Sequence, residues 1–269
     1  MHLKLSQTKW GRDTGQTSQV SIVLMKRLIA LLSLAFFFSS LSSAEDDGLV
    51  LMYNDIEPYL FSENGKLSGF LAPYMTDVVL KANITPIWRN IPWDKQLDIL
   101  KRNQPNVCSV ALFKTPERET YTKYTAPIGA DIGFVLVGNK SNPALKKHQS
   151  FNEVLNDKNL KPILQLHTVF NPYVDALLAE KKFPRLPGSI PRMMRMLVNN
   201  PQSYIIVTPT IGDALIKKNG FSEELTAFSH YRDIKEVSSY YVACSLNTDE
   251  VLFARFNQSI IQQGMVKAH

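Results

Sequence analysis

The residue best placed for binding chemistry is an arginine in the first turn of an expected helix. Thr115 is a favourable N-cap and Pro116 suits the first helical position, so the helix begins here and Arg118 is its third residue. A helix N-terminus is the positive end of the helix dipole, and a cation there is unfavourable unless another group compensates it. Arg118 is therefore either a cation that faces a bound anion or a surface charge whose ion pair contributes little. The carboxylates available for such a pair are Glu117, Glu119 and Asp131.

Other candidate side chains follow expected strands in the same way. In open α/β sheets, ligands bind beyond the carboxyl ends of the strands, where loops and helix N-termini converge. Applied to this chain, the rule predicts a cleft lined by aromatic side chains with one fixed cation. The residues that it selects are Glu57, Tyr59, Trp93, Phe113, Arg118, His167 and Thr168.

Each of these residues also has an ordinary structural interpretation. Trp93 can be a core residue of the helix that it begins, because large aromatic side chains are mostly buried whatever their role. A single histidine at a strand end, such as His167, is often hydrogen-bonded only to its own loop. Glu57 and Tyr59 belong to a loop beside the expected cleft, and position alone does not assign them to a ligand.

The elements that would position these residues alternate between strands and helices. Short apolar runs predict strands, and apolar residues spaced by three and four predict helices; this alternation indicates mostly parallel sheets covered by helices. A polar, lysine-rich stretch at 139–149 divides the alternation into two parts. The expected strands are 49–53, 84–91, 107–113, 132–137, 162–166, 204–207 and 237–245, and the main expected helices are 69–82, 93–101, 151–156, 171–182, 190–199, 210–218 and 250–263.

The start of the chain carries a targeting signal. Met25-Lys26-Arg27 precedes the apolar run 28–38, which at eleven residues is too short to span a bilayer. Small residues at Ser42 and Ala44 predict a signal peptide over 25–44 that is cleaved after Ala44, which places the mature protein in the periplasm. Residues 1–24 precede this signal without hydrophobic periodicity, and we interpret them as an over-extended N-terminus.

Charge and cysteine content exclude several classes of function. Five of the 30 basic residues and one of the 24 acidic residues lie in 1–44, which leaves 25 basic and 23 acidic residues, a net charge of +2. That balance gives no basis for nucleic-acid binding. No metal-ligating or phosphate-binding motif is present, so we expect no metal and no cofactor. In an exported protein, Cys108 and Cys244 are either a disulfide or two reduced thiols.

The order of several short motifs resembles a known family. Pro58-Tyr59 ends the first loop, Gly69-Phe70 begins the first long helix, Pro92-Trp93 precedes the second helix and a Thr-x-x-Arg turn ends at Arg118. In this order, from about Leu49 to Gly264, the chain is similar to the family 3 bacterial extracellular solute-binding proteins, which include periplasmic amino-acid receptors. The resemblance implies a type II periplasmic-binding-protein fold: two α/β lobes with mostly parallel sheets, joined by two hinge crossovers. The implied lobes are 45–136 plus 231–269, and 137–230.

The resemblance also implies roles for individual residues. Arg118 corresponds to the arginine that holds a ligand carboxylate through a bidentate pair. Trp93 corresponds to the aromatic residue that covers the ligand, and His167 and Thr168 correspond to the second-lobe helix start that meets it.

Three departures from the family pattern make an ordinary L-amino acid an unexpected ligand. The segment Ile206-Val207-Thr208-Pro209 lacks the aspartate that pairs with an α-ammonium group. His167 stands where glycine is usual, and Phe113 stands where a small polar residue is common.

The leading hypothesis is therefore a monomeric, non-enzymatic receptor that closes on a small carboxylate-bearing or anionic solute. Its partner would be an inner-membrane ABC permease or a membrane sensor. One alternative is a dehydratase-like enzyme on the same scaffold, in which Glu57 or His167 acts as general acid or base. The other is a degenerate two-lobe protein that binds a protein partner.

Overall fold

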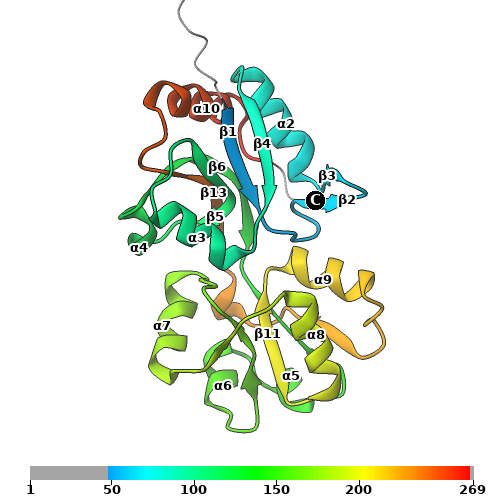
Figure 1. Cartoon of the computed structure of the whole chain (residues 1–269). Coiled ribbons are helices and arrows are strands. Elements are labelled where there is room, and N and C mark those ends of the chain that lie inside the picture. Colours follow the sequence, from blue (N-terminus) through cyan, green and yellow to red (C-terminus); the bar gives the residue numbers. More distant parts are fainter. Residues whose placement is uncertain (1–47, 267–269) are drawn as a thin grey trace, which may run out of the picture. The chain divides into compact units, whose positions relative to one another are not determined.

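The computed structural model describes residues 48–266, which belong to one compact unit that spans 47–269. Its first β-sheet combines strands from both ends of this unit. β1 pairs in parallel with β4 and β5, and β13 runs antiparallel to β5 and β6. The strand order is β4 (Thr85–Asn90), β1 (Gly48–Tyr53), β5 (Val107–Phe113), β13 (Val237–Ser245) and β6 (Thr122–Ile132) (Figure 1).

Helices cover both faces of this sheet. On one face, α2 (Leu71–Lys81) and α10 (Glu250–Gln263) pack together over a core that includes Met75, Phe256 and Ile260. On the other face, α3 (Trp93–Lys101) packs through Leu97 and Leu100. A short hairpin, β2 (Phe61–Glu63) with β3 (Lys66–Ser68), precedes α2, and the four-residue helix α4 (Pro116–Glu119) follows β5.

The second sheet has the strand order β12 (Leu225–Phe228), β7 (Val135–Asn139), β11 (Ser203–Val207) and β8 (Lys161–Pro162). Only the β8–β11 pair is parallel within it. Its cores are apolar side chains of the strands and surrounding helices. The helices are α5 (Pro143–Lys147), α6 (Phe151–Asn156), α7 (Pro172–Lys181), α8 (Ile190–Asn199) and α9 (Pro209–Lys218), and a separate ribbon joins β9 (Leu164–Gln165) to β10 (Arg185–Leu186).

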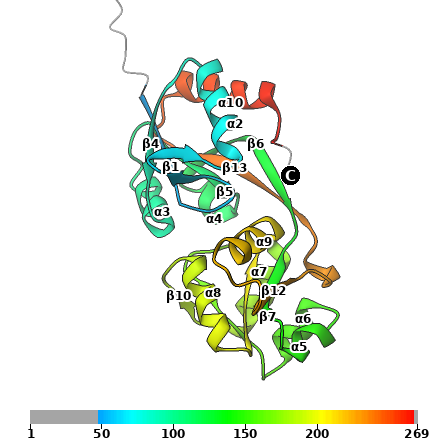
Figure 2. The ribbon, with the colours of Figure 1, turned by 90° about the vertical axis from the view of Figure 1, so that its right-hand side faces the viewer.

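Two connections join the sheets and run beside each other. The chain passes from β6 to β7 through residues 133–134, and returns from β12 to β13 through a segment that contains the 3-10 helix η1 (Arg232–Ile234) (Figure 2). The backbone N–H of Phe134 donates to the carbonyl of Ile234 at 2.8 Å. Gly133 has φ +68°, and a Cβ there would lie 2.4 Å from the same carbonyl oxygen, so glycine permits this close approach.

The observed strands correct the expected ones in several respects, one of which is that the expected strand 162–166 is two short strands, β8 and β9, in different sheets. The expected strand 132–137 is two strands, because Gly133 breaks it where the chain changes sheets. β6 and β12 were not predicted; β6 contains Pro127 and Gly129, which weaken a strand pattern. The sheets are mixed rather than mostly parallel, because the strands that border the two connections run antiparallel to their neighbours.

Cys108 and Cys244 form a disulfide bond, as one of the two sequence interpretations stated. They face each other on the antiparallel strands β5 and β13, with Cα atoms 3.9 Å apart.

The predictions for the N-terminal segment concern residues that the structure does not describe. The predicted signal peptide 25–44, its cleavage after Ala44 and the over-extended segment 1–24 lie outside the described residues. Among residues 48–266, no helix is long and apolar enough to cross a membrane.

Candidate functional site

Arg118 lies at the start of α4 in the arrangement expected from the sequence. The Thr115 side chain caps this helix by accepting a hydrogen bond from the Arg118 backbone N–H at 3.2 Å. The Arg118 side chain is buried, with 3 % of its surface exposed. Its Nη1 donates to the carbonyl of Phe113 at 2.8 Å and its Nη2 to the carbonyl of His167 at 3.3 Å. Burial lowers the pKa of the guanidinium below its ordinary value.

The carboxylates near Arg118 in sequence have other partners. Glu117 pairs with Lys101 at 3.3 Å and Glu119 with Lys114 at 2.7 Å. Within residues 48–266, no ion pair reaches Arg118; its charge meets two carbonyl oxygens and the ring of Trp93, whose centroid lies 5.4 Å from Cζ. The interpretation of Arg118 as a surface ion-pair residue is therefore wrong.

His167 reaches the site through its backbone. Its carbonyl accepts hydrogen bonds from Arg118 and, at 3.3 Å, from the indole N–H of Trp93, while its imidazole is exposed. The residue adopts φ +60°, in the left-handed region that favours glycine. This conformation explains why a glycine would suit the position.

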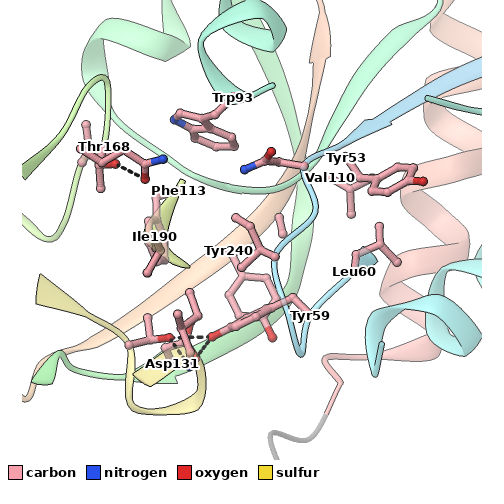
Figure 3. A pocket seen from close by; sticks show the side chains of 17 residues that line it. Tyr53, Tyr59, Leu60, Trp93, Val110, Phe113, Asp131, Thr168, Ile190 and Tyr240 are labelled. Atoms are coloured by element: carbon pink, nitrogen blue, oxygen red, sulfur yellow. Dashed lines mark hydrogen bonds between the residues drawn. The ribbon is translucent and has the colours of Figure 1, made fainter. Parts of the chain in front are cut away.

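A cavity of about 130 Å³ opens beside these residues and draws its walls from both sheets (Figure 3). Four of the predicted site residues line it: Tyr59, Trp93, Phe113 and Thr168. Arg118 and His167 lie next to this wall without lining the cavity. The other lining residues are Tyr53, Asn54, Ile56, Leu60, Val110, Ala111, Asp131, Gln165, Val169, Ile190, Thr208, Ile211 and Tyr240.

A local irregularity of β5 shapes one side of the cavity. Opposite β13, the register steps from Leu112–Tyr241 to Ser109–Ala243, so β5 has one residue more than its partner. The extra residue makes a β-bulge, within which Ala111 adopts φ +64°. The bulge brings Val110 and Ala111 to the cavity wall.

A hydrogen-bonded chain of three side chains closes the cavity at the end of β6. The Tyr59 hydroxyl donates to Oδ1 of Asp131 and lies 3.0 Å from Oγ1 of Thr208, as the dashed lines in Figure 3 show. Thr208 also caps α9, because its Oγ1 accepts from the backbone N–H of Ile211 at 3.4 Å. The chain thus links the loop after β1, the end of β6 and the start of α9.

Burial dominates the electrostatics of this chain. It raises the pKa of Asp131 to about 6, and the hydrogen bond from Tyr59 opposes that rise. Burial also raises the pKa of Tyr59, and the neighbouring Asp131 charge raises it further. Burial raises the pKa of Tyr240 as well. The hydroxyls of Tyr59 and Tyr240 therefore stay protonated at neutral pH.

Aromatic rings pack around the same end of the cavity. The ring of Tyr59 meets those of Phe70 and Tyr240, with centroids 4.9 Å and 5.6 Å away. Gly129 on β6 leaves room for Tyr240, because a Cβ at position 129 would lie 2.2 Å from the Tyr240 hydroxyl oxygen.

Glu57 lies outside this cavity and lines an adjoining one of about 570 Å³. There it forms an ion pair with Lys218 of α9. The two cavities share Asn54, Ile56, Trp93, Gln165 and Ile190 along their boundary.

Sequence reasoning missed Asp131 and Tyr240 as cavity residues because it did not predict β6 or its pairing with β13. The available signal was a single acidic residue within the otherwise apolar and small segment Ala126–Val135. In the described part of the chain, no group of three His, Cys, Asp or Glu side chains is arranged to hold a metal ion.

Solved structures with the same fold include receptors and a sensor domain. A histidine kinase sensor domain with similarity to periplasmic binding proteins has a TM-score of 0.66 at 18 % identity, covering 80 % of this chain and 89 % of its own. An ancestral arginine-binding protein bound to arginine has a TM-score of 0.66 at 16 % identity, covering 80 % and 92 %. The substrate-binding protein of an amino acid ABC transporter has a TM-score of 0.61 at 18 % identity, covering 80 % and 92 %.

These similarities confirm the two-lobe periplasmic-binding-protein fold. No curated protein sequence matches the chain. A family model, described as bacterial extracellular solute-binding proteins, family 3, matches residues 49–261. The chain belongs to the family 3 bacterial extracellular solute-binding proteins.

Proposed function

We propose that this protein is exported to the periplasm and closes its two lobes on one small solute in the 130 Å³ cavity. The observation that carries the proposal is the origin of the cavity wall, which combines Trp93 and Tyr59 from the first lobe with Thr168 and Thr208 from the second. A solute that contacts both lobes favours their closed arrangement, which is how hinge closure transmits binding.

We propose that the protein delivers the solute to an ABC permease. The alternative is that a membrane sensor binds the closed protein. Solved relatives of the same fold belong to both kinds of system: one serves an amino acid ABC transporter and another is a histidine kinase sensor domain. We propose that the protein acts as a monomer and releases the solute chemically unchanged.

The proposed solute carries a carboxylate or another anionic group that reaches past the cavity lining to Arg118, which lies next to the wall. Both terminal nitrogens of Arg118 already donate to carbonyl oxygens, one of them from His167 of the second lobe. A ligand carboxylate is a stronger acceptor for a guanidinium than a neutral carbonyl. It would replace the carbonyl of His167 as acceptor of the 3.3 Å hydrogen bond and supply the negative counter-charge that Arg118 lacks.

Substitution of Arg118 tests this assignment. Small carboxylates, each paired with its methyl ester, would be titrated calorimetrically into the mature protein and into Arg118→Ala. We expect Arg118→Ala to lose about ten- to a hundredfold in affinity for the carboxylates, because hydrogen bonds to charged groups contribute about 1.5–3 kcal/mol. Affinity for the esters should change little.

The matched control is Arg102→Ala, which removes an exposed arginine at the end of α3. Unchanged carboxylate affinity in Arg118→Ala would show that Arg118 has only a structural role. Chemical conversion of a bound solute during long incubation, followed by mass spectrometry, would instead support the enzyme hypothesis. Failure of every small solute to stabilise the protein would favour the protein-partner hypothesis.

A further inference from the structure

Asp131 is the only charged side chain among those that line the 130 Å³ cavity within the described residues. It is 4 % exposed, so the protein surrounds it almost completely. Its Oδ1 accepts the hydrogen bond from Tyr59, whereas its Oδ2 accepts none from residues 48–266 and keeps some accessible surface. A buried carboxylate with an unpaired oxygen is costly unless a partner meets it.

The direction of the hydrogen bonds makes Asp131 the final acceptor of the chain. An ionised carboxylate can only accept, so Tyr59 uses its single proton for Asp131. The Tyr59 oxygen then accepts from the hydroxyl of Thr208, whose oxygen accepts from the N–H of Ile211. The proton order is thereby fixed, and the remaining acceptor capacity of Asp131 is available to a donor in the cavity.

The walls around Asp131 favour a cation. Aromatic rings of Tyr59, Tyr240, Phe113 and Trp93 line the cavity, and the faces of such rings attract cations. No Lys, Arg or His is among the described lining residues, since Arg118 lies behind the wall.

The adjoining cavity, like the 130 Å³ cavity, carries a net negative charge. Its lining contains the carboxylates of Asp55, Glu57 and Asp94 and one cation, Lys218, which pairs with Glu57. A cleft whose charged side chains are mostly carboxylates raises the local concentration of cations.

We propose that the cavity binds a small organic cation, a protonated amine with an apolar body, whose nitrogen donates to Oδ2 of Asp131. The proposal rests on the solute-binding function and specifies the ligand at the Asp131 end of the cavity. A cavity of about 150 Å³ holds benzene in an engineered protein, so the apolar body here is about one ring in size. Binding at Asp131 does not require Arg118, which lies outside the cavity lining.

The first test compares ligands with one body and different head groups. The probes are 2-phenylethylamine, 2-phenylethanol, 3-phenylpropionate and phenylalanine, with isobutylamine and isobutanol as a smaller pair. Calorimetric titration at pH 7.5 should show each amine binding about ten- to a hundredfold more tightly than its alcohol. Asp131→Asn should abolish that preference and leave the affinity for the alcohols within about threefold, because a neutral amide keeps the shape without the charge.

The control variant is Asp98→Asn, an exposed carboxylate on α3, which should retain the preference for amines. Circular dichroism would establish that Asp131→Asn is folded.

A second measurement uses only the unmodified protein. The titratable groups that face Asp131 are Tyr59 and Tyr240, and both stay protonated at neutral and acidic pH because burial raises their pKa values. The pKa of Asp131 is about 6. The preference for amine over alcohol should therefore be complete near pH 7.5 and fall about tenfold for each pH unit below 6.

Three results would overturn the inference: equal affinity for amine and alcohol, a preference that persists in Asp131→Asn, or no binding of either amine. If the amines fail while 3-phenylpropionate binds in an Arg118-dependent manner, this inference falls and the proposed carboxylate receptor stands. If the amines bind through Asp131 and Arg118→Ala loses no affinity for any carboxylate, the inference stands and the anionic-solute assignment falls.

Discussion

At the scale of single residues, Asp131 combines a cost in stability with a capacity to bind. Its carboxylate is 4 % exposed and receives one hydrogen bond, from Tyr59. Burial raises its pKa from 3.8 to about 6, which means that the folded protein disfavours the ionised form. A shift of this size corresponds to about 3 kcal/mol at neutral pH. Binding sites often retain such unfavourable groups because their ligands need them.

Asp131→Asn should accordingly stabilise the empty protein at pH 7.5 by up to about 3 kcal/mol. The folded pKa lies above the unfolded one, so between pH 4 and 6 the folded state holds a proton that the unfolded state has lost, and stability falls as pH rises through this window. The advantage of asparagine should thus be full above pH 6 and nearly absent at pH 4. Denaturant unfolding at both pH values measures it, and an equal difference at pH 4 and 7.5 would contradict the explanation.

At the scale of elements, short segments hold the site in place. α4 has only four residues, Pro116–Glu119, too few to be stable alone, yet it carries Arg118. Its N-cap, Thr115, fixes the backbone N–H of Arg118. The bulge in β5 at Val110 and Ala111 similarly turns a regular strand into a cavity wall. The positions of the site residues therefore depend on local departures from regular structure.

Thr115→Ala should lower the free energy of unfolding by about 1 kcal/mol, because it removes the side-chain acceptor of an N-terminal backbone N–H. Ser189→Ala is the matched control. Ser189 is the N-cap of α8 but makes no side-chain capping hydrogen bond, so we expect almost no loss there. Urea unfolding of both variants measures the difference, and equal losses would argue against the capping role of Thr115.

At the scale of the whole molecule, the disulfide joins two strands that lie on either side of the second sheet in sequence. Cys108 and Cys244 are 136 residues apart, and the segment between them contains β6, the entire second sheet and both connections. Closing so long a loop restricts the unfolded chain strongly. The bond also fixes β5 against β13, the two strands beside the bulge that lines the cavity.

Replacement of both cysteines by alanine should lower the free energy of unfolding by about 2–5 kcal/mol, with the upper value from loop-closure entropy. Chemical unfolding with and without dithiothreitol measures the effect. The wild-type protein should lose stability in reductant, whereas Cys108→Ala with Cys244→Ala should be insensitive. A wild-type protein equally insensitive to reductant would show that the bond contributes little.

Several elements could be predicted from the sequence because local signals define them. The bounds of α3, α6, α8, α10, β5 and β13 agree with the expected ranges. The N-cap at Thr115 was also correct, since a capping residue followed by proline is a local signal. β6 was missed because Pro127 and Gly129 disturb its pattern, and only pairing with β13 makes it a strand. Strand pairing joins distant segments, so no local window contains it.

The sequence by itself determined the family motifs, most elements and four of the residues that line the cavity: Tyr59, Trp93, Phe113 and Thr168. The tertiary structure decided the rest. It buried Arg118 against the carbonyl of His167 and placed Asp131 in the cavity. The physical reason is that burial and hydrogen-bond partners, which set the charge and the acceptor capacity of a side chain, arise only when remote segments meet.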